Sequence, residues 1–245
     1  MRKTITYLLC TLLFALCACN KDNNTTEGDV SFEAPQLSEF EKLKSGILPY
    51  RMGKLYEEGK PILVVYLHGG TSKGNDNESP IKETAVEVIR DYLVDTNIPA
   101  IFIIPQCPSS DSWGAKMNKS LDALINIYEN DCAGVYVLGG SMGGTGTWSL
   151  ANSYPNRFSG VMPVAGKPGT ASASNFVGTR VYAVMSESDE VMKTAYQDVS
   201  SFTQSIATAG GKVKYDQIPT SVGWTHANTC EKSYTNERLD WLFGE

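Results

Sequence analysis

Val135-Tyr-Val-Leu-Gly-Gly-Ser-Met-Gly-Gly144 is the stretch that decides the fold. An apolar run, Val135 to Leu138, leads to a serine at position 141 with glycines on both sides, and an apolar-periodic segment follows from Thr145 to Tyr154. A strand, a sharp glycine-flanked turn and a helix form the context in which a serine hydroxyl is presented as a nucleophile. Glycines are needed there because a side chain would collide with the neighbouring strand or helix. The serine would also lie at a helix N-terminus, where free N–H groups favour a developing negative charge.

Strand and helix patterns alternate through the rest of the chain. Three continuous apolar runs, typical of buried parallel strands, lie at 62–67, 99–104 and 135–138. Other patterns predict an edge strand at 47–56, further strands at 158–164, 180–184 and 212–218, and helices at 82–94, 119–128, 141–154, 191–209 and 234–243. This alternation predicts an α/β fold with a mostly parallel central sheet and helices on both faces. Residues 165–179 are few and rich in Gly, Ala and Ser, so we expect no large lid.

A serine hydroxyl needs a base to act as a nucleophile at neutral pH, and the base needs an acid that orients it. After a serine on such a turn, the acid and then the histidine follow along the chain. The chain holds two histidines, and His226 follows the last predicted strand, so His226 is the candidate base. Asp189 follows the strand at 180–184 and is the candidate acid, with Glu187 and Glu190 as alternatives.

His68-Gly-Gly70 follows the first buried strand. Glycine at this place lets a backbone N–H approach a substrate closely and donate to an oxyanion. We therefore expect the oxyanion donors to be the backbone N–H groups of Met142 and Gly70, with Thr71 as the alternative to Gly70. His68 is expected to hold the loop together by hydrogen bonds rather than to transfer protons.

Composition limits the partners and the compartment. The chain has 245 residues, enough for one α/β domain, and a net charge of −6 without a basic block, so nucleic acid is not an expected partner. No Cys-x-x-Cys motif or Cys/His cluster occurs, so we expect no metal, and a serine triad needs no organic cofactor. Outside the cytoplasm one pair among Cys107, Cys132 and Cys230 could form a disulfide, and the sequence leaves the pairing open.

The N-terminal residues are typical of a targeting segment rather than of the fold. A basic start, Arg2-Lys3, precedes an apolar run over 7–15, and Leu16-Cys-Ala-Cys19 resembles a bacterial lipobox, in which a cysteine carries a lipid after cleavage. The sequence thus predicts a lipid on Cys19, a signal peptide over 1–18, a polar tether over 19–34 and a catalytic domain over 35–245. A plain secretory signal is the alternative. A lipid anchor would place the protein in the bacterial cell envelope, outside the cytoplasm, with the outer membrane as the expected site.

Further motifs extend across most of the predicted domain. They are Tyr66-Leu-His-Gly-Gly-Thr-Ser-Lys-Gly-Asn-Asp76, Ile104-Pro-Gln-Cys-Pro108 with Trp113, Gly140-Ser-Met-Gly-Gly-Thr-Gly-Thr-Trp148 and Tyr154-Pro-Asn-Arg-Phe158. Through them the chain resembles the α/β-hydrolase esterases described as predicted peptidases or phospholipase/carboxylesterase-like proteins, relatives of feruloyl and acetylxylan esterases and of polyhydroxybutyrate depolymerases. The resemblance implies the α/β-hydrolase fold and a triad of Ser141, Asp189 and His226. Two positions depart from the family pattern: Met185-Ser186 replaces a His-Gly before the acid, and Thr145 replaces a frequent aromatic.

The resemblance also bears on two tryptophans. In the family, a tryptophan at the place of Trp113 tends to line the substrate cleft, where it can stack on a sugar or phenolic ring. A loop anchor is the alternative for Trp113. Trp224, two residues before His226, is a second candidate for substrate binding with the same alternative.

The expected function is that of a serine carboxylester hydrolase that acts through an acyl-enzyme on small or carbohydrate-linked esters, acetyl or feruloyl. The substrate class rests on the family resemblance alone. A serine peptidase of the same fold is the alternative, ranked lower because nothing in the chain resembles an added propeller or cap domain. A non-catalytic surface binding protein ranks last, because serine, acid and histidine occur in the required order.

Overall fold

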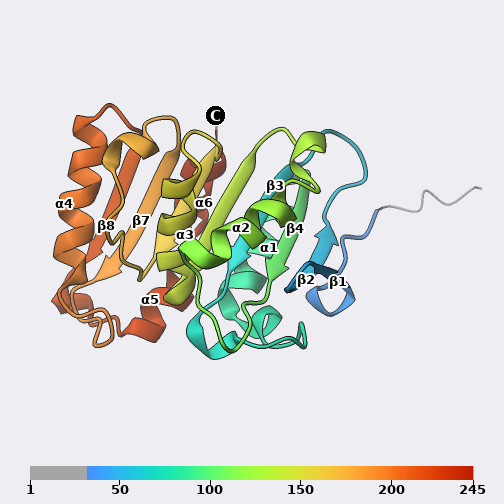
Figure 1. Ribbon diagram of the computed structural model, residues 1–245, viewed down its shortest axis with the longest axis horizontal. Helices are drawn as coiled ribbons and strands as arrows, with labels where there is room; N and C mark the ends of the chain where they lie inside the picture. Colours follow the sequence, from blue (N-terminus) through green and yellow to red (C-terminus); the bar gives the residue numbers. More distant parts are fainter. Residues whose placement is uncertain (1–31, 245) are drawn as a thin grey trace, which may run out of the picture. The chain divides into compact units, whose positions relative to one another are not determined.

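An eight-stranded sheet runs through the part of the chain that the computed structural model describes, residues 32–244 (Figure 1). Its spatial order is β1-β2-β4-β3-β5-β6-β7-β8. β2 pairs antiparallel with both β1 and β4, and all other neighbours are parallel. The strands are β1 (Glu41–Ser45), β2 (Leu48–Lys54), β3 (Ile62–Leu67), β4 (Ala100–Pro105), β5 (Val135–Gly140), β6 (Gly160–Val164), β7 (Arg180–Ser186) and β8 (Val213–Ile218).

Helices cover both faces of this sheet (Figure 1). One face carries α2 (Ala115–Ile125), α3 (Met142–Ser153) and α4 (Ala195–Thr208), and the other carries α1 (Thr84–Asp95), α5 (His226–Lys232) and α6 (Asn236–Phe243). Short 3-10 turns lie at Leu37–Glu39, Gly70–Ser72, Pro80–Lys82, Glu129–Asp131, Ala173–Phe176 and Thr220–Val222. Because β3 to β8 run parallel, their carboxyl ends lie together along one side of the sheet, where side chains that follow different strands can meet.

The two faces of β3 explain its unbroken apolar sequence. Leu63, Val65 and Leu67 belong to the core beneath α2, α3 and α4. Val64 and Tyr66 point to the opposite side, into the core beneath α1 and α6. Successive side chains of a strand point to opposite faces, so a strand buried on both sides needs an apolar residue at every position.

Most of the elements expected from the sequence are confirmed, with shifts of a few residues at their ends. The prediction that 47–56 is an edge strand is wrong, because β1 lies outside β2 and forms the edge. β1 escaped prediction because its Glu-Lys-Leu-Lys-Ser sequence is exposed or only half-buried and carries three charges. α5 was also missed, and α2 begins at Ala115, earlier than expected.

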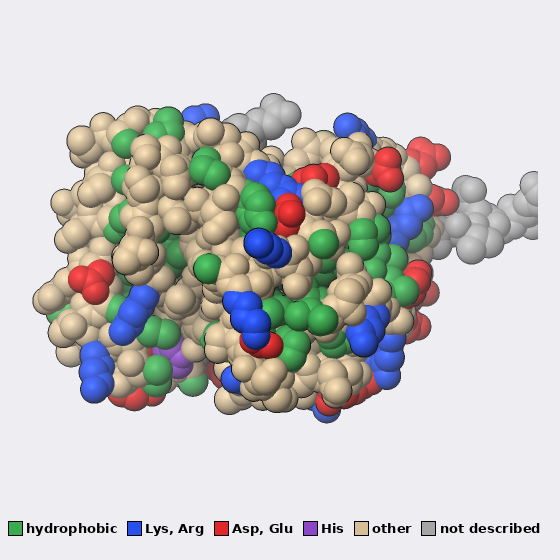
Figure 2. All heavy atoms as spheres, in the orientation of Figure 1, with side chains coloured by type: hydrophobic (Ala, Val, Ile, Leu, Met, Phe, Trp, Pro, Cys, Tyr) green, Lys and Arg blue, Asp and Glu red, His purple; other side chains and the backbone are tan. Residues whose placement is uncertain are grey.

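Residues 165–179, which connect β6 to β7, contain one short 3-10 turn. This connection therefore holds no large insertion that could form a lid. Within residues 32–244 no helix is both long and apolar enough to cross a bilayer. The predicted signal peptide, the lipid on Cys19 and most of the tether lie outside the described residues. On the face seen in Figure 2, side chains of both charges are interspersed.

Candidate active site

Ser141 lies in the tight turn between β5 and α3, with a φ of 58° and a ψ of −117°. A non-glycine residue at positive φ is strained by roughly 1–3 kcal/mol and persists only where its surroundings fix it. Here the surroundings are close-packed backbone. A Cβ added at Gly143 would lie 1.7 Å from the carbonyl oxygen of Leu67, and one at Gly144 would lie 2.2 Å from that of Val164. The glycines thus let α3 lie directly against β3 and β6, which turns the Ser141 side chain outward.

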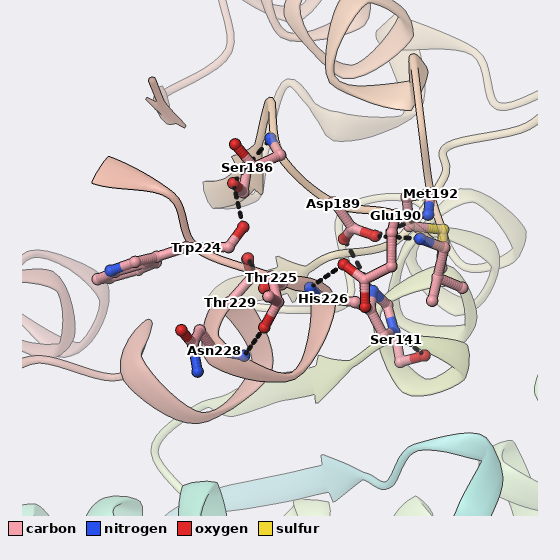
Figure 3. A network of polar contacts seen from close by, with 12 residues as sticks. Ser141, Ser186, Asp189, Glu190, Met192, Trp224, Thr225, His226, Asn228 and Thr229 are labelled. Atoms are coloured by element: carbon pink, nitrogen blue, oxygen red, sulfur yellow. Dashed lines mark hydrogen bonds and ion pairs between the residues drawn. The ribbon is translucent and has the colours of Figure 1, made fainter. Parts of the chain in front are cut away.

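Three side chains from distant parts of the sequence form one chain of hydrogen bonds (Figure 3). The Ser141 Oγ lies 2.7 Å from Nε2 of His226. On the other side of the ring, Nδ1 of His226 lies 2.7 Å from Oδ2 of Asp189. An ionised carboxylate only accepts hydrogen bonds, so Nδ1 carries the proton and Nε2 is free to accept the hydroxyl proton of Ser141. The structure therefore brings together the three residues that chain order singles out.

Asp189 is fixed by more than the histidine. Its Oδ1 accepts hydrogen bonds from the backbone N–H of Val191 at 2.9 Å and of Met192 at 2.7 Å. The residue is only 2% exposed. Burial raises the pKa of the Asp189 carboxyl, but the hydrogen bonds from His226 and the Met192 amide outweigh it and leave the pKa below its ordinary value. Asp189 is thus ionised at neutral pH and rigidly aimed at the imidazole.

The two alternative acids have other partners. Glu187 accepts hydrogen bonds from the side chain of Gln217 and from both the N–H and the hydroxyl of Thr220. Glu190 accepts from the backbone N–H of His226 at 3.0 Å. Glu190 therefore holds the main chain of His226, whereas Asp189 holds its ring. Nothing in the sequence pattern separates these two roles.

His226 is the first residue of α5, a helix that follows β8. Thr225 caps this helix, because its side-chain oxygen accepts from the N–H of Asn228. The hydrogen bond from the His226 N–H to Glu190 and the cap by Thr225 together fix the backbone from which the imidazole reaches Ser141.

The backbone N–H groups of the two expected oxyanion donors have no partner in the described protein. Met142 is the first residue of α3, and Gly70 is the first residue of the 3-10 turn Gly70–Ser72, so neither N–H has a partner within its own helix. Within residues 32–244 neither N–H donates to another protein group. A Cβ added at Gly69 would lie 3.8 Å from the Cβ of Ser141, which places this loop directly beside the serine. Gly70 itself faces open space.

His68 is fully buried and holds the loop through both ring nitrogens. Its Nε2 accepts a hydrogen bond from the backbone N–H of Cys107 at 2.9 Å, so Nδ1 carries the proton and donates to the Gly69 carbonyl at 2.6 Å. Burial lowers the pKa of His68 from 6.5 to about 4. A neutral ring with both nitrogens occupied is placed to support the loop, as expected from the sequence.

This buried histidine predicts a loss of stability in mild acid. The pKa of His68 is lower in the folded chain than in the unfolded chain, so below pH 6.5 the unfolded state binds the proton first. The stability of the folded state then falls as the pH falls towards 4, by about 2 kcal/mol between pH 7 and pH 5. Urea unfolding at both pH values would measure this loss. The variant His68→Asn should lose clearly less between the two pH values, and an equal loss in both proteins would contradict the assignment.

Neither tryptophan proposed for substrate binding lines the cavity at Ser141. Trp113 is 4% exposed, and its indole N–H donates to the His68 carbonyl at 3.0 Å. Its ring packs edge-on against the ring of His68, so the loop-anchor alternative holds for Trp113. Trp224 is half-buried and its ring points away from Ser141 (Figure 3). Its carbonyl accepts from the Ser186 hydroxyl at 2.6 Å, so Trp224 ties the α5 turn to the end of β7.

A cavity of about 610 Å³ opens beside Ser141 and His226. The loop Gly69–Ser72 forms one wall, and the segment from Ser79 to Ala85 and four residues of α5, His226 among them, form others. Tyr66 is the one aromatic residue among those lining the cavity, and it is only 1% exposed. The cavity therefore presents small and flexible side chains rather than an aromatic platform.

The three cysteines of the described residues are free thiols, so none of the pairings left open by the sequence is formed. Cys107 and Cys132 are buried in the core, and Cys230 lines the cavity. Burial raises the pKa of the Cys230 thiol to about 12. Among residues 32–244 no group of three or more His, Cys, Asp or Glu side chains is arranged to hold a metal ion.

Solved structures of similar fold include several hydrolases. A thermostable esterase has a TM-score of 0.73 and 25% sequence identity over 84% of this chain, and the chain spans 63% of the length of that esterase. An esterase from Pyrococcus furiosus has a TM-score of 0.61 and 14% identity, covering 91% of this chain and 97% of its own. Est1E from Butyrivibrio proteoclasticus, solved with ferulic acid bound, has a TM-score of 0.58 and 12% identity, covering 79% of this chain and 95% of its own. No protein-family model matches the sequence, and no curated protein matches it.

Sheet order, the strained serine turn and these neighbours define the class. The described part of the chain has the α/β-hydrolase fold, with a mostly parallel sheet, helices on both faces and no large lid after β6.

Proposed function

We propose that the protein is a serine carboxylester hydrolase. The observation that carries the proposal is the hydrogen-bond chain from Asp189 through His226 to Ser141, which ends at an open cavity. The 25% identical thermostable esterase of the same fold supports an ester as the bond attacked. Chain order, backbone strain at Ser141 and ring tautomer of His226 all agree with this chemistry.

Each of the three side chains has a distinct role in the proposed reaction. The Ser141 Oγ attacks the ester carbonyl while Nε2 of His226 takes the hydroxyl proton. The same Nε2–H then donates its proton to the alcohol as the carbon–oxygen bond breaks, which leaves an acyl group on Ser141. Water, deprotonated by His226, releases the acid and restores the serine. Asp189 keeps the ring in the required tautomer and stabilises its charged form throughout.

The oxyanion of both tetrahedral intermediates would be bound by the N–H groups of Met142 and Gly70. Such donors stabilise the transition state more than the bound ester, because negative charge develops on the carbonyl oxygen only as the serine attacks. Removing one of them typically costs about a hundred- to a thousand-fold in rate. The N-terminus of α3 adds a favourable dipole at the same place.

Of the two ester classes, acetyl and feruloyl, the lining of the cavity favours acetyl esters of carbohydrates. A feruloyl group would be expected to stack on an exposed aromatic ring, and the lining of the cavity provides none. We further propose that the enzyme works in the bacterial cell envelope, held by a lipid on Cys19, on esters outside the cytoplasm.

A substrate panel tests the function. Purified protein lacking the first 19 residues should hydrolyse para-nitrophenyl acetate and acetylated xylan faster than methyl ferulate. A peptide anilide should be turned over far more slowly, because an amine is a poorer leaving group than an alcohol. Preference for the anilide would replace the esterase proposal with a peptidase. If folded protein hydrolyses none of these substrates, a non-catalytic binding role becomes the favoured function.

A further inference from the structure

A carboxylate that the triad does not use lies against the loop that carries Gly70. Glu83 immediately precedes α1, and its side chain reaches back to the strand end at β3. Its Oε1 accepts hydrogen bonds from the backbone N–H of Gly69 at 3.0 Å and from the Ser72 hydroxyl at 2.6 Å. Its Oε2 accepts from the Tyr66 hydroxyl at 2.9 Å. Glu83 therefore connects the strand, the loop and the helix at a single point.

These contacts belong to a wider set that fixes two successive peptide units. In the first unit, the His68 carbonyl accepts from the indole of Trp113, and the Gly69 N–H donates to Glu83. In the second unit, the Gly69 carbonyl accepts from Nδ1 of His68 and from the N–H of Ser72. Of the four polar groups in these two units, only the N–H of Gly70 has no protein partner within residues 32–244.

The hydrogen bonds of the His68 carbonyl, the Gly69 N–H and the Gly69 carbonyl fix the direction in which the N–H of Gly70 points. The peptide is trans, so the N–H of Gly70 points opposite to the carbonyl of Gly69. Because glycines at 69 and 70 restrict the backbone very little, the hydrogen bonds must supply the order. Without an acceptor at Glu83, the N–H of Gly69 and the hydroxyl of Ser72 would lose their shared anchor beside the serine.

We propose that Glu83 is a positioning residue that clamps the oxyanion loop and thereby aims the N–H of Gly70 at the reacting carbonyl oxygen. The inference rests on the proposed esterase function and adds to it a residue that does not touch the reacting atoms. Hydrogen-bond acceptance, not negative charge, is the property required. Glutamine at this position would offer its carbonyl oxygen to Gly69 and Ser72 and its NH₂ group to the oxygen of Tyr66.

The experiment compares kcat and KM for Glu83→Ala and Glu83→Gln on para-nitrophenyl acetate, with unfolding midpoints measured on the same samples. Glu83→Ala should lower kcat by about 10- to 100-fold with KM within about 2-fold of the unmodified protein, because an oxyanion donor acts mainly in the transition state. Glu83→Gln should restore kcat to within about 3-fold of the unmodified protein. Glu87→Ala, an exposed glutamate one turn further along α1, is the matched control and should change neither constant.

Ser72→Ala keeps the test decisive if Glu83→Ala does not fold. It removes one of the three donors to Glu83 and should lower kcat several-fold at an unchanged KM. Folded Glu83→Ala with unchanged kcat, folded Glu83→Gln as slow as Glu83→Ala, or Ser72→Ala with unchanged kcat would each overturn the clamp. Failure of the esterase proposal itself is distinguishable, because the unmodified protein would then hydrolyse none of the esters.

Discussion

Replacing Ser141 with alanine is expected to lower kcat for para-nitrophenyl acetate by a factor on the order of 10⁴ to 10⁶. The substitution removes the Oγ that lies 2.7 Å from Nε2 of His226, and no other hydroxyl takes its place in that hydrogen-bond chain. Residual turnover would come from the oxyanion donors and the cavity alone. Initial rates with the purified variant measure the effect.

Labelling separates loss of the nucleophile from loss of the fold. A fluorophosphonate should modify the unmodified protein at Ser141, as identified by peptide mass, and should leave Ser141→Ala unlabelled. Ser79→Ala is a suitable control, because Ser79 lines the same cavity without contacting the triad. Retention of ester hydrolysis in folded Ser141→Ala would remove the proposed mechanism.

Replacing Gly143 with alanine is expected to destabilise the fold by about 3 kcal/mol or more. The new Cβ would lie 1.7 Å from the carbonyl oxygen of Leu67 and 2.9 Å from that of His68. Both contacts are with backbone, so no side chain can rotate away to relieve them. Either α3 must move off β3 or the strand end must shift, and both changes disrupt the Ser141 turn. In a chain of this size the loss corresponds to a fall in Tm of about 6–12 °C.

Gly114→Ala is the matched control for this prediction. Gly114 lies immediately before α2, also at the start of a helix, but a Cβ added there meets nothing within 4 Å. Its Tm should stay within about 2 °C of the unmodified protein. Equal Tm values for the two variants would show that the close approach at Gly143 is not what the turn depends on.

The sequence predicted those parts of the fold that depend on residues close together in the chain. Three buried runs became β3, β4 and β5, because strands covered on both faces are apolar at every position. The serine turn was predictable because its glycines are demanded by backbone contacts rather than by side-chain choice. Ser141, Asp189 and His226 could be selected by chain order, since the fold places the strand ends in that order along one edge.

The remaining features depend on contacts between distant segments. Glu83 and Gly69 are 14 residues apart, and no periodicity marks a carboxylate that accepts hydrogen bonds across such a distance. The choice between Asp189 and Glu190 also depends on direction, because both contact His226 but only one contacts its ring. The role of Trp113 also depends on a distant contact. Its N–H donates to the carbonyl of His68, so this tryptophan is buried and supports the neighbouring loop instead of binding substrate.

His226 lies 85 residues after Ser141, and all eight strands precede it in the sequence. The sheet that surrounds Ser141 is therefore encoded completely before the imidazole that the proposed reaction needs. A nascent chain halted before α5 would contain the strained turn and its loop but no base, and it would be chemically inert. In the proposed mechanism, hydrolytic competence thus depends on the segment after β8, and a chain truncated there would keep the serine turn without its base.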